Sequence, residues 1–165
     1  MAASEIDSER PHRGSIEHLS EHALRERMEE EVNRAGRHGT ALSCLLLSLD
    51  DLPELRRAGG EELCEQVLAY VQLALRHELR RFDRVGRGPH GELLLLLPGA
   101  DLTRGEIVAR RVLARLRAIK LVLAGERRAL RVAAGLAPWR AGMSAGALLD
   151  RTRAAAITEN GRPPS

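Results

Sequence analysis

The sequence predicts an α+β fold, in which helices flank a central, mostly antiparallel sheet of about five strands. Three observations lead to this prediction. The run Ala41–Leu49 is almost wholly apolar, as in a strand buried on both faces. The segments Arg81–Arg87 and Glu92–Leu97 flank the turn Gly88-Pro89-His90-Gly91, which predicts a hairpin. Segments with helical periodicity lie before, between and after these strands.

The predicted helices follow from apolar residues that recur every three or four positions. In the first helix these residues are Leu19, Leu24, Met28 and Val32, and in the second they are spaced by four. Thr103 and Glu106 have the spacing of a capping box at the start of the third. The helices are expected at Ile16–Arg37, at Gly60–Leu79, after Thr103, and at Ser144–Thr158.

Two further segments are candidate strands near the end of the chain. Leu130–Ala137 is apolar and rich in small residues, and Leu121–Leu123 has the composition of a short strand. The polar residues 1–14 and the Gly- and Pro-containing residues 161–165 are expected to be tails. The 165-residue chain is therefore predicted to hold one domain, at residues 15–160.

Composition and charge exclude several classes of protein. The net charge is only +3, and no basic stripe with interleaved aromatics is present, so the chain does not have the pattern of a nucleic-acid binder. No apolar run has the length of a membrane span or a signal peptide, which predicts a cytoplasmic protein. Cys44 and Cys64 lie in apolar surroundings and are expected to be buried, reduced thiols. Lys120 is the only lysine, and arginine offers the planar donor fork that suits guanine edges and phosphates.

The most informative stretch runs from Arg80 to Gly99. It resembles the pattern R-x-x-D-x-x-a-R-y-G-G-D-E-F-x-x-l-L-P-g of GGDEF domains, the nucleotide-cyclase fold that makes cyclic di-GMP. The positions that agree are Arg80, Asp83, Arg87, Glu92, Leu97, Pro98 and Gly99. The resemblance extends from about Ser20 to Arg162, and it implies a cyclase-like sandwich.

The departures from this pattern affect the positions that an active cyclase needs. The signature itself reads Pro89-His90-Gly91-Glu92-Leu93. The two carboxylates that hold metal in active members correspond to Ser48 and Gly91, and neither side chain can ligate Mg²⁺ as a carboxylate does. The family's guanine-binding Asn and Asp are absent, with Arg56 and Arg57 in their place, and Asn160 stands near the position of the last helix's lysine.

These departures make the chain resemble a degenerate GGDEF domain. It is expected to have no diguanylate cyclase activity, no catalytic residues, no metal and no cofactor. A metal cluster of His77, His90 and Glu92 is disfavoured, because their spacing matches no strong ligand pattern.

The pair Arg80 and Asp83 survives in register. In GGDEF domains this R-x-x-D motif is the inhibitory site that binds cyclic di-GMP. An arginine fork can donate to guanine O6 and N7, and a carboxylate can accept from N1 and N2. Arg76 and Arg84 are close enough in sequence to assist an anionic ligand. The plain alternative is an ion pair between Arg80 and Asp83 at the helix end.

Two functions follow from this reading. The first is a cyclic di-GMP receptor in bacterial second-messenger signalling. The second is a nucleotide-independent pseudoenzyme module for protein–protein interaction, with a partner surface on a helix such as Ile16–Val32. A homodimer and residual GTP binding also remain open.

Overall fold

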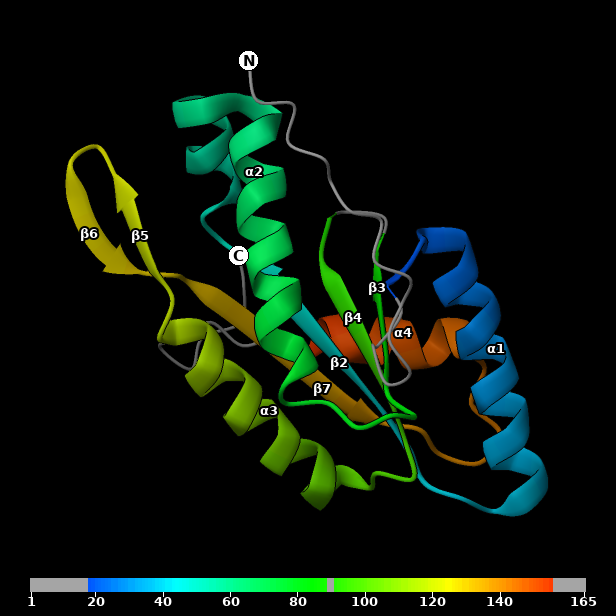
Figure 1. The fold of residues 1–165 in the computed structure, drawn as a ribbon. Helices are drawn as coiled ribbons and strands as arrows, with labels where there is room; N and C mark the ends of the chain where they lie inside the picture. Colours follow the sequence, from blue (N-terminus) through cyan, green and yellow to red (C-terminus); the bar gives the residue numbers. More distant parts are fainter. Residues whose placement is uncertain (1–17, 89–90, 156–165) are drawn as a thin grey trace.

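The computed structural model describes residues 18–88 and 91–155 (Figure 1). The elements alternate along the chain and confirm the α+β class. The helices are α1 (Glu21–His38), α2 (Leu52–Arg76), α3 (Leu102–Arg117) and α4 (Ala145–Ala154). The strands are β1 (His18–Leu19), β2 (Leu42–Leu49), β3 (Arg84–Arg87), β4 (Leu93–Pro98), β5 (Lys120–Leu123), β6 (Glu126–Ala129) and β7 (Val132–Pro138).

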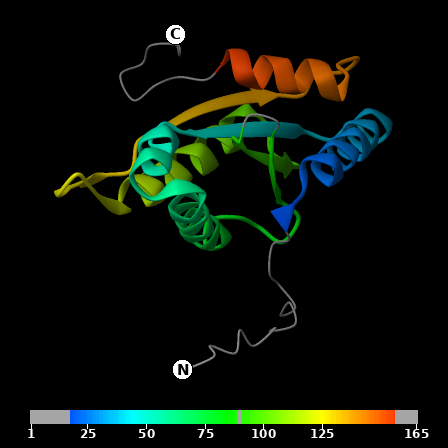
Figure 2. The same cartoon turned by 90° about the horizontal axis from the view of Figure 1, so that it is seen from above.

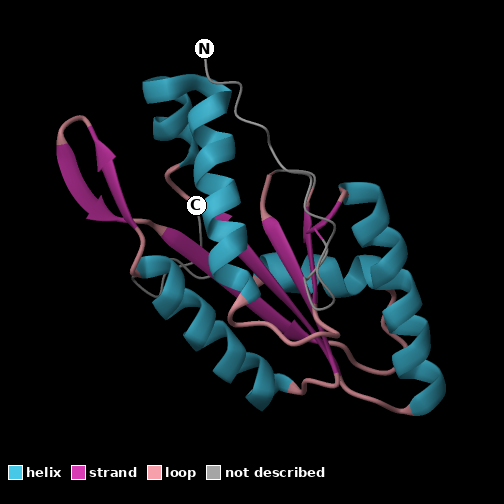
Figure 3. Ribbon diagram, in the orientation of Figure 1, coloured by secondary structure: helices cyan, strands magenta, loops and turns pink. Residues whose placement is uncertain are grey.

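The central sheet has five strands in the order β1-β3-β4-β2-β7. Every neighbouring pair is antiparallel except β1 and β3, which agrees with the predicted mostly antiparallel sheet. The strands β5 and β6 form a separate two-stranded ribbon that projects from one side of the molecule (Figure 3).

The sheet is buried on both faces, and alternate residues of β2 show this directly. Leu45 and Leu47 pack in a cluster with α2 and α3, whereas Cys44 and Leu46 pack in a cluster with α1 and α4. Figure 2 shows α4 and α2 on opposite sides of the sheet. The apolar runs of β2 and β4 are therefore strands with no solvated face.

Several predicted boundaries are wrong, for identifiable reasons. The helix α1 begins at Glu21, where Ser20 Oγ accepts from the Ala23 amide, and it is preceded by a short strand. The third helix is capped by Asp101, whose carboxylate accepts from the Arg104 amide, and not by Thr103. Residues 81–83 belong to a turn, so β3 starts at Arg84. The strand β6 was not predicted, and residues 16–17 and 156–158 of the predicted helices lie outside the described part.

The bounds of the second helix differ from the predicted Gly60–Leu79, since the helix starts earlier and ends at Arg76. It begins at Leu52, and Gly60 in its middle has φ 70° and ψ −166°. A positive φ of this kind is easily reached only by glycine, so the helix bends there and resumes. Both cysteines are buried free thiols, as predicted. In the described residues, none of the helices is at once long and apolar enough to cross a membrane.

Candidate functional site

Two neighbourhoods hold the residues that the sequence singled out. The first, which we call the hairpin site, comprises Ser48, Gly91, Glu92 and Arg153. Strands β2 and β4 pair antiparallel as far as Leu47 opposite Leu93, so Ser48 and Glu92 are the next residues on each side. By alternation they belong to the face that α4 covers, the face to which Cys44 and Leu94 contribute.

The carboxylate of Glu92 is held by an arginine from α4. Arg153 Nη2 lies 2.9 Å from Glu92 Oε1, and the glutamate is only 7% exposed. Gly88 makes room for this carboxylate, because a Cβ at residue 88 would collide with Glu92 Oε1. The last helix is thereby tied to the hairpin through a mostly buried ion pair.

The other members of the hairpin site offer few oxygen atoms that could ligate a metal ion. Gly91 is exposed and has φ 79°, and its amide donates to the Gly88 carbonyl. Ser48 is half-buried and offers a hydroxyl. Leu93 is a fully buried core residue of β4, and Pro89 and His90 lie outside the described residues. Nearby, burial raises the pKa of the Cys44 thiol to about 12, so this cysteine is unreactive.

This donor set does not fit a Mg²⁺ ion, which prefers several hard, charged oxygens. The only carboxylate among the four residues is already neutralised by a guanidinium. Within residues 18–88 and 91–155, no group of three or more His, Cys, Asp or Glu side chains is placed to hold a metal.

The second neighbourhood is the RxxD turn, residues Arg80–Asp83, in the connection between α2 and β3. The Asp83 amide donates to the Arg80 carbonyl at 3.1 Å, and the Arg80 amide donates to Asp83 Oδ2 at 2.8 Å. These two bonds close a turn whose corners are Arg81 and Phe82. The direct contact between Arg80 and Asp83 is therefore between main chain and carboxylate, and it leaves the Arg80 side chain exposed.

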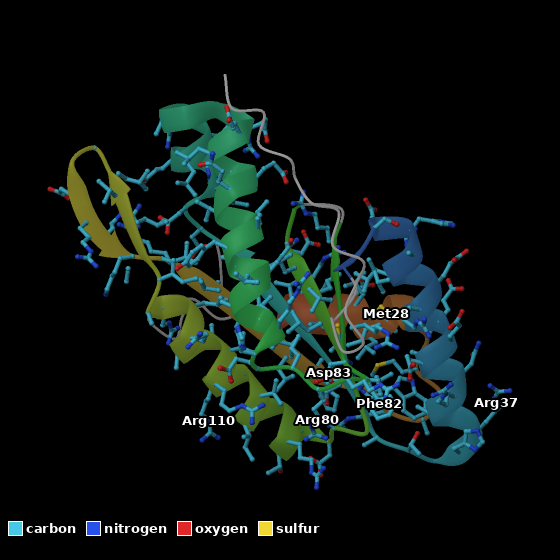
Figure 4. All side chains as sticks on the ribbon, viewed as in Figure 1. Met28, Arg37, Arg80, Phe82, Asp83 and Arg110 are labelled. Atoms are coloured by element: carbon cyan, nitrogen blue, oxygen red, sulfur yellow. The ribbon has the colours of Figure 1, made fainter. Side chains whose placement is uncertain are left out.

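Arginines surround this turn. Arg84 Nη1 donates to the carbonyls of Arg81 and Asp83, at 3.0 and 3.1 Å. From α3, Arg111 Nη2 donates to the Glu78 carbonyl at 2.9 Å. Arg76 is exposed at the end of α2, and no hydrogen bond joins it to the turn in the described structure. Figure 4 shows Arg80, Phe82 and Asp83 together on this connection, with Arg110 on α3.

The Asp83 carboxyl is 4% exposed, and its burial raises its pKa. The Arg80 amide and the positive charges of Arg80, Arg84 and Arg111 act against this rise. The group is thus a buried acceptor within a positive field.

The comparisons with known proteins agree with this architecture. Residues 19–160 match the family model described as diguanylate cyclase, GGDEF domain. The chain belongs to the GGDEF family. It is 29% identical over 129 residues to diguanylate cyclase DgcP of Pseudomonas aeruginosa, a match that spans 78% of this chain and 19% of DgcP. The chain therefore covers about a fifth of the length of that relative.

Solved structures of GGDEF domains share the fold. Diguanylate cyclase SiaD of Pseudomonas aeruginosa, solved in complex with its activator SiaC, superposes with a TM-score of 0.75 at 29% identity. That match covers 82% of this chain and 52% of the SiaD chain. The GGDEF domain of DgcB from Caulobacter crescentus, solved with c-di-GMP, has the same TM-score at 16% identity, over 83% and 80% of the two chains, which shows the fold alone.

Within this GGDEF domain, two contacts of the candidate sites had no signal in the sequence. Arg153 is 61 residues from Glu92, and Arg111 is 33 residues from Glu78. In an arginine-rich chain nothing distinguishes these two from other helical arginines. Only the packing of α3 and α4 on the sheet brings them to the two neighbourhoods.

Proposed function

We propose that this GGDEF domain does not make cyclic di-GMP and instead binds it at the RxxD turn. The observation that carries the proposal is the geometry of Arg80–Asp83, a closed turn with an exposed arginine fork beside a buried carboxylate. The hairpin site supports the first half, since Ser48 and Gly91 stand where the family places metal-bearing carboxylates and Glu92 is engaged by Arg153.

The chemistry of the turn suits a guanine base. The Arg80 guanidinium can donate in parallel to O6 and N7, a bidentate contact that a point-like cation does not reproduce. Asp83 Oδ2 is occupied by the Arg80 amide, which leaves Oδ1 to accept from guanine N1 and N2. Arg84 and Arg111 add positive charge for the phosphates, although both already donate to main-chain carbonyls. Arg76 is the most remote member of the predicted ligand set.

Calorimetry with cyclic di-GMP tests this proposal. We expect the wild type to bind, and Arg80→Ala to weaken binding at least a hundredfold, because a charged bidentate contact is lost. Arg80→Lys should bind nearly as weakly, since lysine keeps the charge and loses the fork. Arg34→Ala, at an exposed arginine on α1, is the matched control and should bind as the wild type does.

Asp83→Asn separates the carboxylate's two roles. Its amide oxygen can still accept from the Arg80 amide, but its NH₂ group would face the guanine donors. This variant should therefore fold normally and bind weakly. Absence of binding by the wild type, or accumulation of cyclic di-GMP from GTP with Mg²⁺ or Mn²⁺, would overturn the proposal.

A groove on another face favours the second function, a protein-interaction module. Its volume is about 690 Å³, and it lies between α2, the end of α3 and the β5–β6 ribbon. Tyr70 and Leu73 are exposed along it, its rim carries Arg115, Lys120 and Arg127, and no acidic residue lines it among those described. We infer that this groove, and not a surface on α1, is the partner site. Its occupant is an acidic amphipathic helix of a partner protein.

A labelled helical peptide with leucines on one face and glutamates on the other is the probe for this groove. Fluorescence anisotropy should show binding that Tyr70→Ala with Leu73→Ala removes. The same peptide with lysines in place of glutamates should not bind. Equal affinity for both peptides would contradict the inferred charge complementarity, and self-association that the double variant abolishes would identify a second copy instead.

A further inference from the structure

Phe82 is the only phenylalanine of the chain, and it is 69% exposed. The core of this protein is built from Leu, Val and Ala, and it does not recruit this ring. The ring instead occupies a corner of the RxxD turn, one residue before Asp83 and two after Arg80.

The turn that carries Phe82 is rigidly held. Two hydrogen bonds join Arg80 and Asp83, and Arg84 Nη1 binds the carbonyls of Arg81 and Asp83. The segment leading into it is fastened by Arg111 to the Glu78 carbonyl. An aromatic ring on such a turn is presented to solvent in a defined place, so little conformational freedom remains to be lost when a ligand binds.

We propose that Phe82 is a stacking platform for a purine base of the cyclic dinucleotide held at this turn. This inference rests on the proposed function. A base gripped at its edge by the Arg80 fork leaves its two faces open. An exposed aromatic ring two residues along the same turn can cover one of them. Stacking on aromatic side chains is a general means of holding bases whose edges are read by other groups.

The neighbouring charges favour the same ligand. Arg80 and Arg81, the two residues before Phe82, are exposed, and Arg84 Nη1 binds the carbonyls of Arg81 and Asp83 in the same turn. Arginines beside an exposed ring attract phosphates and also stack on bases. An exposed ring on a segment that carries three arginines is therefore complementary to a ligand that is both flat and anionic. It is less suited to a purely apolar partner surface.

The test is a calorimetric comparison of four variants with cyclic di-GMP. Phe82→Ala should weaken binding by on the order of tenfold or more, because the loss of one base–aromatic stacking contact lowers affinity by about that factor. Phe82→Trp should keep the wild-type affinity, because it retains an aromatic ring. Phe82→Leu should bind as poorly as the alanine variant, because leucine keeps apolar bulk without a ring. Arg81→Gln, at the other corner, reports whether a change in the turn alone weakens binding, and it should have a smaller effect than Phe82→Ala.

A spectroscopic readout completes the experiment. The wild type has a single tryptophan, Trp139, so the added emission of Phe82→Trp reports on the turn. Stacking should quench that emission on titration, while wild-type emission stays unchanged. If the wild type binds and Arg80→Ala does not, but Phe82→Ala binds with wild-type affinity, the stacking role is wrong and the receptor proposal stands. If the wild type does not bind, both are wrong.

Discussion

The hairpin site and the RxxD turn each contain a buried carboxylate, and the two carboxylates are compensated in different ways. Glu92 is matched by a full positive charge, that of Arg153, brought from a helix 61 residues away. Asp83 is matched by a main-chain amide three residues away, within a turn whose arginine side chain remains exposed. The first arrangement uses its guanidinium in an internal ion pair, whereas the second leaves the Arg80 guanidinium exposed to solvent.

The difference shows that this domain compensates two buried carboxylates independently, one through a distant helix and one within a local turn. At the hairpin site the Arg153 guanidinium offsets the charge of the buried Glu92 carboxylate. It ties α4 to the sheet as it does so. The RxxD turn differs in that the two hydrogen bonds that close it join residues only three positions apart.

The largest effect is expected from breaking the ion pair of the hairpin site. Arg153→Met should lower the free energy of unfolding by about 2 kcal/mol, because it removes the Arg153 guanidinium from a buried carboxylate; the partial exposure of Arg153 moderates the cost. Urea denaturation measures this. The double variant Glu92→Gln with Arg153→Met should recover more than half of the loss. Strictly additive losses in the two single variants would show that the pair is not coupled.

The next largest effect is expected at Asp83, the carboxylate whose hydrogen-bond partner is only three residues away. Asp83→Ala should cost about 1–2 kcal/mol, since the Arg80 amide loses its acceptor in a buried setting. Asp83→Asn should cost less than about 0.5 kcal/mol because an amide oxygen can take the same bond. Equal losses in the two variants, measured by urea denaturation, would contradict this role of the carboxylate oxygen.

The difference in stability between the wild type and Asp83→Asn should depend on pH, with a defined sign. Burial raises the pKa of Asp83 above its ordinary value of 3.8, so the folded protein keeps this proton to higher pH than the unfolded chain does. Between 3.8 and the raised value, the stability of the wild type relative to Asp83→Asn should fall as pH rises, and it should be constant above that range. A relative stability that increases with pH in this window would mean that the carboxylate is instead stabilised in its charged form.

Restoring carboxylates to the hairpin site should not restore a cyclase. In the double variant Ser48→Asp with Gly91→Asp, the second change places a side chain at φ 79° and should cost about 1 kcal/mol. We expect no cyclic di-GMP from GTP and Mg²⁺, because Arg153 still neutralises Glu92 and the guanine contacts near Arg56 and Arg57 are absent. An active diguanylate cyclase assayed in parallel is the control. Product from the double variant would show that the two carboxylates alone were missing.

The sequence predicted those parts of the fold whose physics is local. The apolar runs of β2 and β4 predicted buried strands, and the Arg80–Asp83 motif was found by its register with the family pattern, although residues 81–83 were assigned to a strand and form a turn. The start of α2 was missed because Pro53 and the pair Gly59–Gly60 read as breakers. Pro53 is tolerated in the first turn of the helix, and Gly60 accommodates the bend.

Long-range electrostatics were not predictable in the same way. The contact between Arg80 and Asp83 runs through the Arg80 main chain and not through the ion pair considered as an alternative, and the roles of Arg153 and Arg111 depend on the packing of α4 and α3. The chain has twenty-five arginines, and no sequence pattern shows which of them pairs with a given carboxylate. Spacing therefore located the hairpin and the Arg80–Asp83 motif, but the identity of the charges that compensate the two carboxylates depends on tertiary structure.

The smallest predicted effect comes from Arg87, which lies on β3 between the two regions. Its guanidinium makes a bidentate contact with Glu65, at 3.1 and 2.9 Å, and lowers the pKa of that carboxyl. Because the Arg87 side chain is 39% exposed and that of Glu65 57%, Arg87→Ala should cost less than about 1 kcal/mol, and the cost should shrink with added salt and below the ordinary pKa of the glutamate. Its affinity for cyclic di-GMP should match that of the wild type. A larger, salt-independent loss, or weakened ligand binding, would mean that the hairpin site and the RxxD turn are coupled through β3 and are not the independent regions that their separate compensation implies.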